Sequence, residues 1–183
     1  MCFKVLRYNN LKFSNQQSAI SKTQSGILLI NLGTPDTPHT REVRIFLREL
    51  LSCKRVLDIN PVWRWLLVNF VILPFRSRKS AKAYRKIWLE DGSPLLVYSQ
   101  KLKNALGEQL SEEKIPVELG MQCGRPSLKT AIAKLRRQNC DQIIVLPLYP
   151  QYASSSYGAA IEDLYKVVLN DWNIPYLRII PPF

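Results

Sequence analysis

This 183-residue sequence has a single histidine and no closely spaced cysteines, and both absences exclude several kinds of site. The four cysteines, Cys2, Cys53, Cys123 and Cys140, include no closely spaced pair, so the sequence predicts neither a metal cluster nor a disulfide framework. Scattered single cysteines favour a reducing compartment. The single histidine, His39, follows a proline-rich segment, and we expect a solvated loop residue there rather than a catalytic group.

A long apolar run and a nucleotide-binding motif are also missing. The most apolar stretch, Val62–Leu73, is shorter than the roughly 20 residues that span a bilayer, and Arg64 and Asn69 interrupt it. The sequence contains no GxGxxG and no Walker motif, which argues against a dinucleotide or phosphate-loop site.

The first 25 residues have no acidic residue and no apolar core of a secretory signal. We expect residues 1–25 to form a basic, disordered extension, with a transit peptide as the alternative. The remaining residues, 26–183, are enough for one good-sized core and are predicted to form one domain.

Positive charge is concentrated in one segment. The net charge is +12, and residues 41–86 carry twelve Lys and Arg against three acidic residues. Such an excess indicates a surface that meets phosphates of lipid or nucleic acid. Because an aromatic, apolar run stands just before the cations, Val62–Lys86 is predicted to contact a membrane surface, and a buried helix with a solvated basic face is the alternative. Nucleic acid is not an expected partner, and the expected location is the cytoplasm, peripheral to the inner membrane.

Strand-like and helix-like segments alternate along the chain. Short apolar segments bounded by turn residues predict strands at 26–31, 117–122, 143–146 and 176–180. Helical patterns are predicted from Thr40 as the cap, across Val62–Leu73 until Pro74 ends that helix, and across 79–89, 94–111, 128–135 and 156–170. This order predicts an α/β fold with a doubly wound, parallel, Rossmann-like sheet.

The segment after the third predicted strand is the best candidate for a ligand site. Tyrosines, a glutamine and several serines follow the strand in the stretch 146–158. Open α/β sheets bind ligands at the carboxyl ends of their strands. The sequence therefore predicts a pocket there for a flat, partly polar ligand.

Five motifs in this order resemble the ferrochelatase family, most closely its bacterial form. They are GILLINLGTPD (Gly26–Asp36), FRSRKSAKAYRKIW (Phe75–Trp88), DGSPL (Asp91–Leu95), LGMQCGRPSL (Leu119–Leu128) and LPLYPQYASSSYG (Leu146–Gly158). The resemblance implies insertion of Fe²⁺ into protoporphyrin IX in haem biosynthesis. It also implies a fold of two similar Rossmann-like, chelatase-type halves that enclose the porphyrin, with a hydrophobic lip on the membrane.

The resemblance also carries over five site residues. Leu32 matches a position under the macrocycle, Arg76 a basic position near the mouth, and Tyr84 an aromatic residue on the cleft side. Tyr149 and Ser155 match pocket positions in the loop after the third strand. Iron is implied as a substrate, and no permanently bound cofactor is expected.

The family's histidine and glutamate, to which proton removal and metal transfer are assigned, belong to its second half. Neither is matched before Phe183, so we expect an amino-terminal half that is catalytically incomplete and has no catalytic residue of its own. A fragment, a truncated remnant and half of a split enzyme with a separate second chain are the three explanations. Because Ser154 stands where some relatives carry a cluster cysteine, no Fe–S cluster is expected. The alternative functions are a non-catalytic porphyrin-binding module and a basic membrane-surface module.

Overall fold

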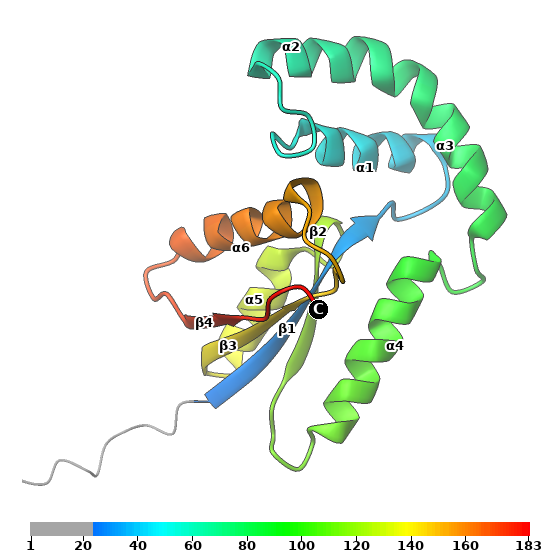
Figure 1. Cartoon of the computed structure of the whole chain (residues 1–183). Coiled ribbons are helices and arrows are strands. Elements are labelled where there is room, and N and C mark those ends of the chain that lie inside the picture. Colours follow the sequence, from blue (N-terminus) through cyan, green and yellow to red (C-terminus); the bar gives the residue numbers. More distant parts are fainter. Residues whose placement is uncertain (1–23) are drawn as a thin grey trace, which may run out of the picture.

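A computed structural model describes residues 24–183, and a four-stranded parallel sheet forms its centre (Figure 1). The strands are β1 (Gln24–Thr34), β2 (Val117–Gly124), β3 (Cys140–Pro147) and β4 (Tyr176–Ile179), in the spatial order β2-β1-β3-β4. All three strand pairs are parallel. The predicted α/β fold with a parallel sheet is therefore confirmed.

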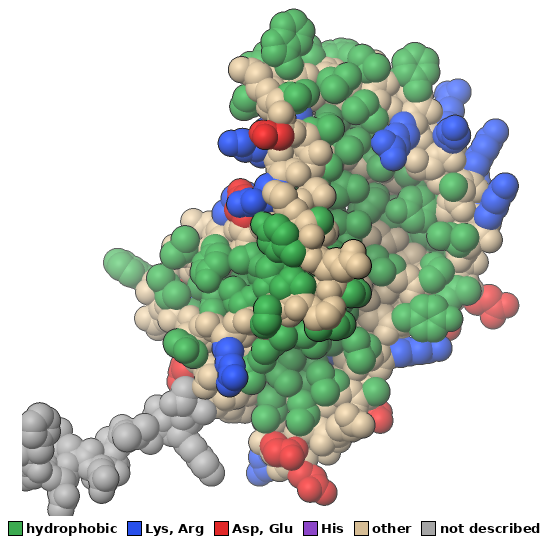
Figure 2. Space-filling model, in the orientation of Figure 1, with side chains coloured by type: hydrophobic (Ala, Val, Ile, Leu, Met, Phe, Trp, Pro, Cys, Tyr) green, Lys and Arg blue, Asp and Glu red, His purple; other side chains and the backbone are tan. Residues whose placement is uncertain are grey.

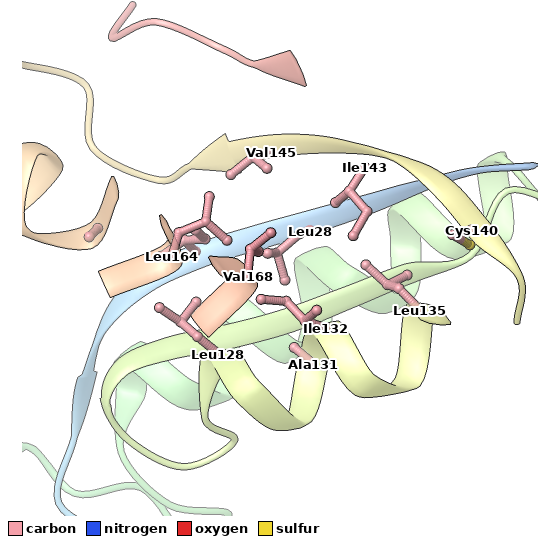
Figure 3. Packing of buried hydrophobic residues seen from close by; sticks show 12 residues of the cluster. Leu28, Leu128, Ala131, Ile132, Leu135, Cys140, Ile143, Val145, Leu164 and Val168 are labelled. Atoms are coloured by element: carbon pink, nitrogen blue, oxygen red, sulfur yellow. The ribbon is translucent and has the colours of Figure 1, made fainter. Parts of the chain in front are cut away.

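Helices cover both faces of this sheet. The helices α5 (Leu128–Arg137) and α6 (Ala159–Leu169) pack on one face, where Leu28, Ile132 and Leu164 are fully buried (Figure 3). The helix α4 (Pro94–Gln109) packs on the other face. Because the central strands meet apolar side chains on both sides, they are continuous apolar runs rather than alternating ones.

Two further helices lie beyond the carboxyl ends of the strands (Figure 1). The helix α1 (Thr40–Ser52) and the helix α3 (Leu73–Ile87) pack against each other through a separate apolar cluster. Cys123, near the end of β2, joins this cluster and ties it to the sheet. The residues after β1 are thereby held over the edge at which open α/β sheets bind ligands.

The segment 61–87 differs from the prediction, because Pro74 does not end a helix. The helix α2 (Pro61–Leu66) continues through a π-helical turn, η1 (Leu67–Ile72), directly into α3. In η1 the backbone N–H of Leu73 donates to the carbonyl of Val68, five residues back. Proline has no backbone N–H to donate, and its ring needs space beside the preceding turn. The first turn after a widened π turn tolerates the missing donor and leaves that space. The prediction of a break at Pro74 was wrong for this reason.

Two smaller differences concern the first strand and its exit. The strand β1 already includes Gln24 and Ser25 and continues through Gly33, which pairs with Cys123 of β2. The extension predicted for residues 1–25 therefore overlaps β1 by two residues, and its first 23 residues lie outside the described residues. At the start of α1, His39 is the N-cap without a side-chain hydrogen bond, so Thr40 does not cap the helix as predicted.

Candidate functional site

A cavity of about 600 Å³ opens at the carboxyl ends of β1 and β3. After β1 the chain crosses to β2, on one side of β1, and after β2 it crosses back over β1 to β3, on the other side. The strand order therefore reverses between β1 and β3, where the cavity opens. The lining comes from β1, from the segment after β3, from the end of α3 and from the start of α4. It consists of Asn31, Gly33, Thr34, Tyr84, Ile87, Ser93, Pro94, Leu95, Tyr98, Ser99, Leu102 and Leu148.

The polar groups in this lining are few and mostly engaged with the protein. The Asn31 side chain donates to the Ser99 hydroxyl over 3.1 Å. The Ser93 hydroxyl accepts from the backbone N–H of Leu96 over 3.2 Å and caps α4. No Lys, Arg, Asp, Glu or His belongs to the lining, so the cavity suits the apolar body of a ligand.

Thr34 is the exception among these polar groups. The residue is buried, and its hydroxyl oxygen has no hydrogen-bond partner among the described residues. Buried hydroxyls without a partner are uncommon in folded proteins. The lining therefore keeps one buried polar atom with unused hydrogen-bonding capacity.

Tyr84 is held in place by two aromatic neighbours. Its ring lies edge-on to Phe46, with centroids 6.3 Å apart, and to Trp88, with centroids 6.1 Å apart. Burial raises the pKa of the Tyr84 phenol above its ordinary value of 10.0. The phenol is therefore protonated at neutral pH, and it can donate a hydrogen bond but cannot act as a base.

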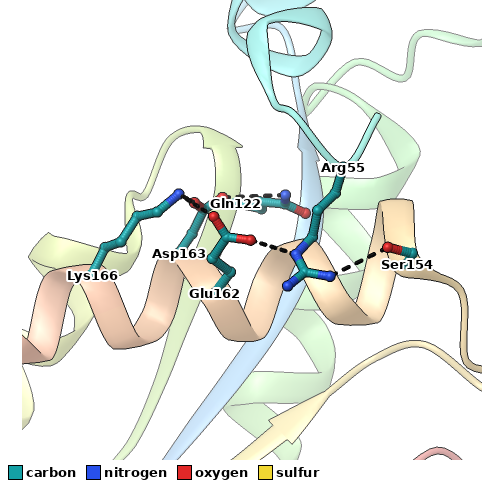
Figure 4. Close-up of polar contacts among 6 residues, drawn as sticks. All are labelled: Arg55, Gln122, Ser154, Glu162, Asp163 and Lys166. Atoms are coloured by element: carbon teal, nitrogen blue, oxygen red, sulfur yellow. Dashed lines mark hydrogen bonds and ion pairs between the residues drawn. The ribbon is translucent and has the colours of Figure 1, made fainter. Parts of the chain in front are cut away.

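The loop after β3 is fixed from the opposite side of the sheet by a polar network (Figure 4). Arg55, in the loop after α1, donates to Glu162 of α6 and, over 3.3 Å, to the Ser154 hydroxyl. Hydrogen bonds from Lys166 and Arg55 lower the pKa of the Glu162 carboxyl, so it is ionised at neutral pH. This network ties the turn η2 (Ser154–Gly158) to the helices beyond the strand ends.

Tyr149 belongs to a second part of this network. Its hydroxyl donates to the Gln122 side chain over 3.4 Å, and Gln122 donates to Asp163 over 3.3 Å. Burial raises the pKa of the Tyr149 phenol far above the ordinary value. Nearby, burial together with the charges of Glu49 and Asp163 raises the pKa of the Cys123 thiol to about 12, so this thiol is protonated and unreactive at neutral pH.

The structure does not place the five predicted site residues in one cavity. Tyr84 lines the cavity. Leu32 is half-buried and does not line it, because it stands in β1 between two lining residues and successive side chains of a strand point to opposite faces. Tyr149 packs against the core under α5 and α6. Ser155 and Arg76 are exposed. Residues of α4 supply the wall that the sequence reasoning missed.

That wall could have been found from a spacing. Leu95, Tyr98 and Leu102 follow each other at intervals of three and four residues, and all three line the cavity although they are partly exposed. Such an apolar stripe on a helix indicates one face, but it does not tell whether the face packs in a core or lines a cavity.

For metal ions the result is plain: within residues 24–183 no group of three or more His, Cys, Asp or Glu is arranged to hold one.

Comparison with known proteins gives a consistent result. The ferrochelatase family model matches residues 24–183. A ferrochelatase of Coxiella burnetii (strain Dugway 5J108-111) is 50% identical over 139 residues, which are 76% of this chain and 39% of the relative. The ferrochelatase of Marinomonas sp. (strain MWYL1) is 47% identical over 85% of this chain and 48% of its own length. The ferrochelatase of Legionella pneumophila (strain Paris) is 48% identical over 86% of this chain and 47% of its own length. The chain thus spans less than half the length of each of these relatives.

Proposed function

The chain belongs to the ferrochelatase family, and we propose that it forms one porphyrin-binding wall of an enzyme that inserts Fe²⁺ into protoporphyrin IX for haem biosynthesis. One observation carries this proposal. Nine of the twelve lining residues belong to four sequence motifs: Asn31, Gly33 and Thr34 of NLGTPD, Tyr84 and Ile87 of the basic motif, Ser93–Leu95 of DGSPL, and Leu148 of the motif after β3. Motifs that are far apart in the sequence therefore meet around one apolar hollow.

The chemistry of the hollow supports the same ligand. A porphyrin is a flat apolar plate with two propionates on one edge, so its body needs apolar walls and its carboxylates need cations at a rim. Leu32, Tyr149, Ser155 and Arg76 are proposed as further contacts around this wall, as the family resemblance implies. Iron is a substrate in this proposal, and no bound cofactor is part of it.

The removal of the two pyrrole protons is not assigned to the lining of this cavity. The lining contains no His, Asp or Glu, the side chains that most often act as bases, and burial raises the pKa of the Tyr84 phenol, so that phenol stays protonated at neutral pH. Because the chain spans less than half of each relative, we propose that a counterpart of the remaining length supplies the opposite wall and the proton acceptor.

The first prediction tests binding and metal insertion separately. Titration of the 183-residue chain with protoporphyrin IX should shift the Soret band and saturate at one porphyrin per chain. Addition of Fe²⁺ under anaerobic conditions should then leave the porphyrin metal-free, because no base lines the cavity. Metal insertion by the chain alone, at a rate above that of an unrelated porphyrin-binding protein, would contradict the assignment of the proton acceptor elsewhere.

A second function, contact with a membrane surface, is favoured by the outer side of the helical stretch 61–87. Within residues 24–183 no helix is long and apolar enough to cross a bilayer. Nevertheless, large apolar side chains are exposed along α2 and η1, and Lys and Arg side chains gather over α3 (Figure 2). The exposed apolar residues of α2 and η1 are Val62, Trp63, Trp65, Leu67, Phe70 and Val71, and Phe75 follows them at the start of α3. Aromatic side chains beside a cationic flank suit the interface of an anionic bilayer.

The second prediction concerns these aromatic residues. The double variant Trp63→Gln, Phe70→Gln should reduce sedimentation with phosphatidylglycerol-containing vesicles about tenfold, because two large apolar side chains no longer enter the interface. Trp172→Gln is the matched control, since Trp172 is fully exposed but lies near β4. An equal loss of vesicle binding in the control variant would contradict a membrane surface at this helix. Binding of the unaltered chain to pure phosphatidylcholine vesicles as strong as to the anionic vesicles would contradict a preference for anionic lipid.

A further inference from the structure

The cavity has an apolar lining, and a cation stands at its rim. Tyr98 lines the cavity and yet leaves 63% of its surface exposed, so its ring lies at the mouth. The ammonium group of Lys101, three residues further along α4, lies over this ring at 5.6 Å from the centroid. An ammonium at that distance over an aromatic face is attracted by the ring and is held beside it.

Lys101 differs in its partners from three lysines that form ion pairs. Lys103, also on α4, lies 3.9 Å from Glu118, and Lys134 and Lys166 also reach carboxylates within 4 Å. Lys101 forms no such ion pair with any residue from 24 to 183. The ring of Tyr98 therefore positions a positive charge that no carboxylate of the described residues neutralises.

The other proposed cation lies further away. Arg76 stands eight residues before Tyr84 on α3, which is about 12 Å along a helix axis at 1.5 Å per residue. The Lys101 ammonium, in contrast, lies against a ring that is itself part of the lining. A ligand whose apolar body fills the cavity and whose acidic edge reaches the mouth beside Tyr98 would bring its carboxylate to the Lys101 ammonium.

From this placement we propose that Lys101, oriented by the Tyr98 ring, binds a carboxylate of the ligand whose apolar body occupies the cavity. The inference rests on the proposed function and extends it, because the carboxylate is then one propionate of the porphyrin. A lysine ammonium has three donors and no acceptor, and it forms charge-assisted hydrogen bonds with a carboxylate. The Tyr98 ring limits the positions that the flexible lysine side chain visits, which lowers the ordering cost of binding.

The third prediction compares protoporphyrin IX with its dimethyl ester, which has the same ring and no carboxylates. Lys101→Met keeps an apolar stem and removes the charge, so it should weaken binding of the diacid about threefold to tenfold and leave the ester unchanged. Lys101→Glu should weaken binding of the diacid further, because like charges then meet. Lys129→Met, at an exposed lysine of α5 on the other side of the sheet, is the matched control and should bind both ligands as the unaltered chain does.

Two further variants test the role of the ring. Tyr98→Leu removes the aromatic face and should lose part of the preference for the diacid over the ester, whereas Tyr98→Phe keeps the face and should retain that preference, whatever its effect on overall affinity. If Lys101→Met weakens both ligands equally or neither, the assignment of Lys101 is overturned while the proposed function stands. If the unaltered chain binds neither porphyrin, the proposed function fails and the assignment fails with it.

Discussion

Replacement of Gly33 by alanine should destabilise the fold strongly and lower the urea midpoint of unfolding by about 2 M. Gly33 has φ of +102°, a region in which side-chain-bearing residues are strained. A Cβ at this position would overlap the carbonyl oxygen of Cys123 and lie 2.8 Å from its carbonyl carbon. Both are backbone atoms of the neighbouring strand and cannot rotate away.

The size of the effect follows from what must move. Gly33 and Cys123 are paired residues of β1 and β2, so the two strands would have to separate at the floor of the cavity. Severe overpacking together with a strained backbone costs about 4 kcal/mol, against a total stability of about 5 to 15 kcal/mol for an ordinary domain. The urea midpoint should therefore fall by about 2 M, given a slope of about 2 kcal/mol per molar urea.

Gly107→Ala is the control for this variant. Gly107 lies in α4, and a Cβ there meets no atom within 4 Å. Alanine is the better helix former, so the control should keep or slightly raise the midpoint. Circular dichroism during urea unfolding measures both variants. A Gly33→Ala midpoint equal to that of the unaltered chain would show that the close approach of β1 and β2 is not required.

The fold was largely predictable because its strands are unambiguous. The segments around Leu28 and Val145 are apolar runs that helices cover on both faces, and such runs are clear strand signals in a sequence. The α5 face was predictable for the same reason, since Leu128, Ala131, Ile132 and Leu135 are all buried.

The continuation of the helix past Pro74 was not predictable from local rules. Proline ends most helices, and only the π turn η1 makes the continuation possible here. That turn depends on tertiary packing, because Val68 and Leu73 are buried against α1 and α3 rather than fixed by their own propensities.

The candidate site was predictable in its position but not in its composition. The rule that ligands bind at the carboxyl ends of strands indicated the edge of the sheet at which the cavity opens. It did not tell which side of that edge is hollow. Tyr149 follows β3 as expected, yet its side chain packs toward α6 and contacts Gln122, whereas Leu148, one residue earlier, lines the cavity. Successive side chains point to opposite sides, so one of these two neighbours faces the cavity and the other faces the core. Because β3 ends at Pro147, the sequence does not tell which of the two faces the cavity.

Leu95→Asp should reduce the affinity for protoporphyrin IX about a hundredfold without unfolding the chain. Leu95 lines the cavity, and its replacement removes apolar contact area and places a carboxylate against an apolar ligand. A hundredfold loss corresponds to about 2.7 kcal/mol. The helix itself should tolerate the change, because Leu95 is in the first turn of α4, where a negative charge is favourable.

Val62→Asp provides a control with the same local chemistry. Val62 is the second residue of α2, directly after Pro61, just as Leu95 follows Pro94 at the start of α4. Both side chains are at least partly exposed, but Val62 lies outside the cavity lining. Any loss of porphyrin affinity that results only from a new aspartate in a first helical turn should therefore appear in both variants.

Whether porphyrin occupies this cavity is decided by the ratio of the protoporphyrin IX dissociation constants of Leu95→Asp and Val62→Asp, measured by Soret titration in the same buffer. We expect a ratio of about 100, set by the loss of apolar contact and the desolvation of one carboxylate. A ratio near one, with both variants binding as tightly as the unaltered chain, would show that porphyrin does not occupy the hollow between β1, α3 and α4.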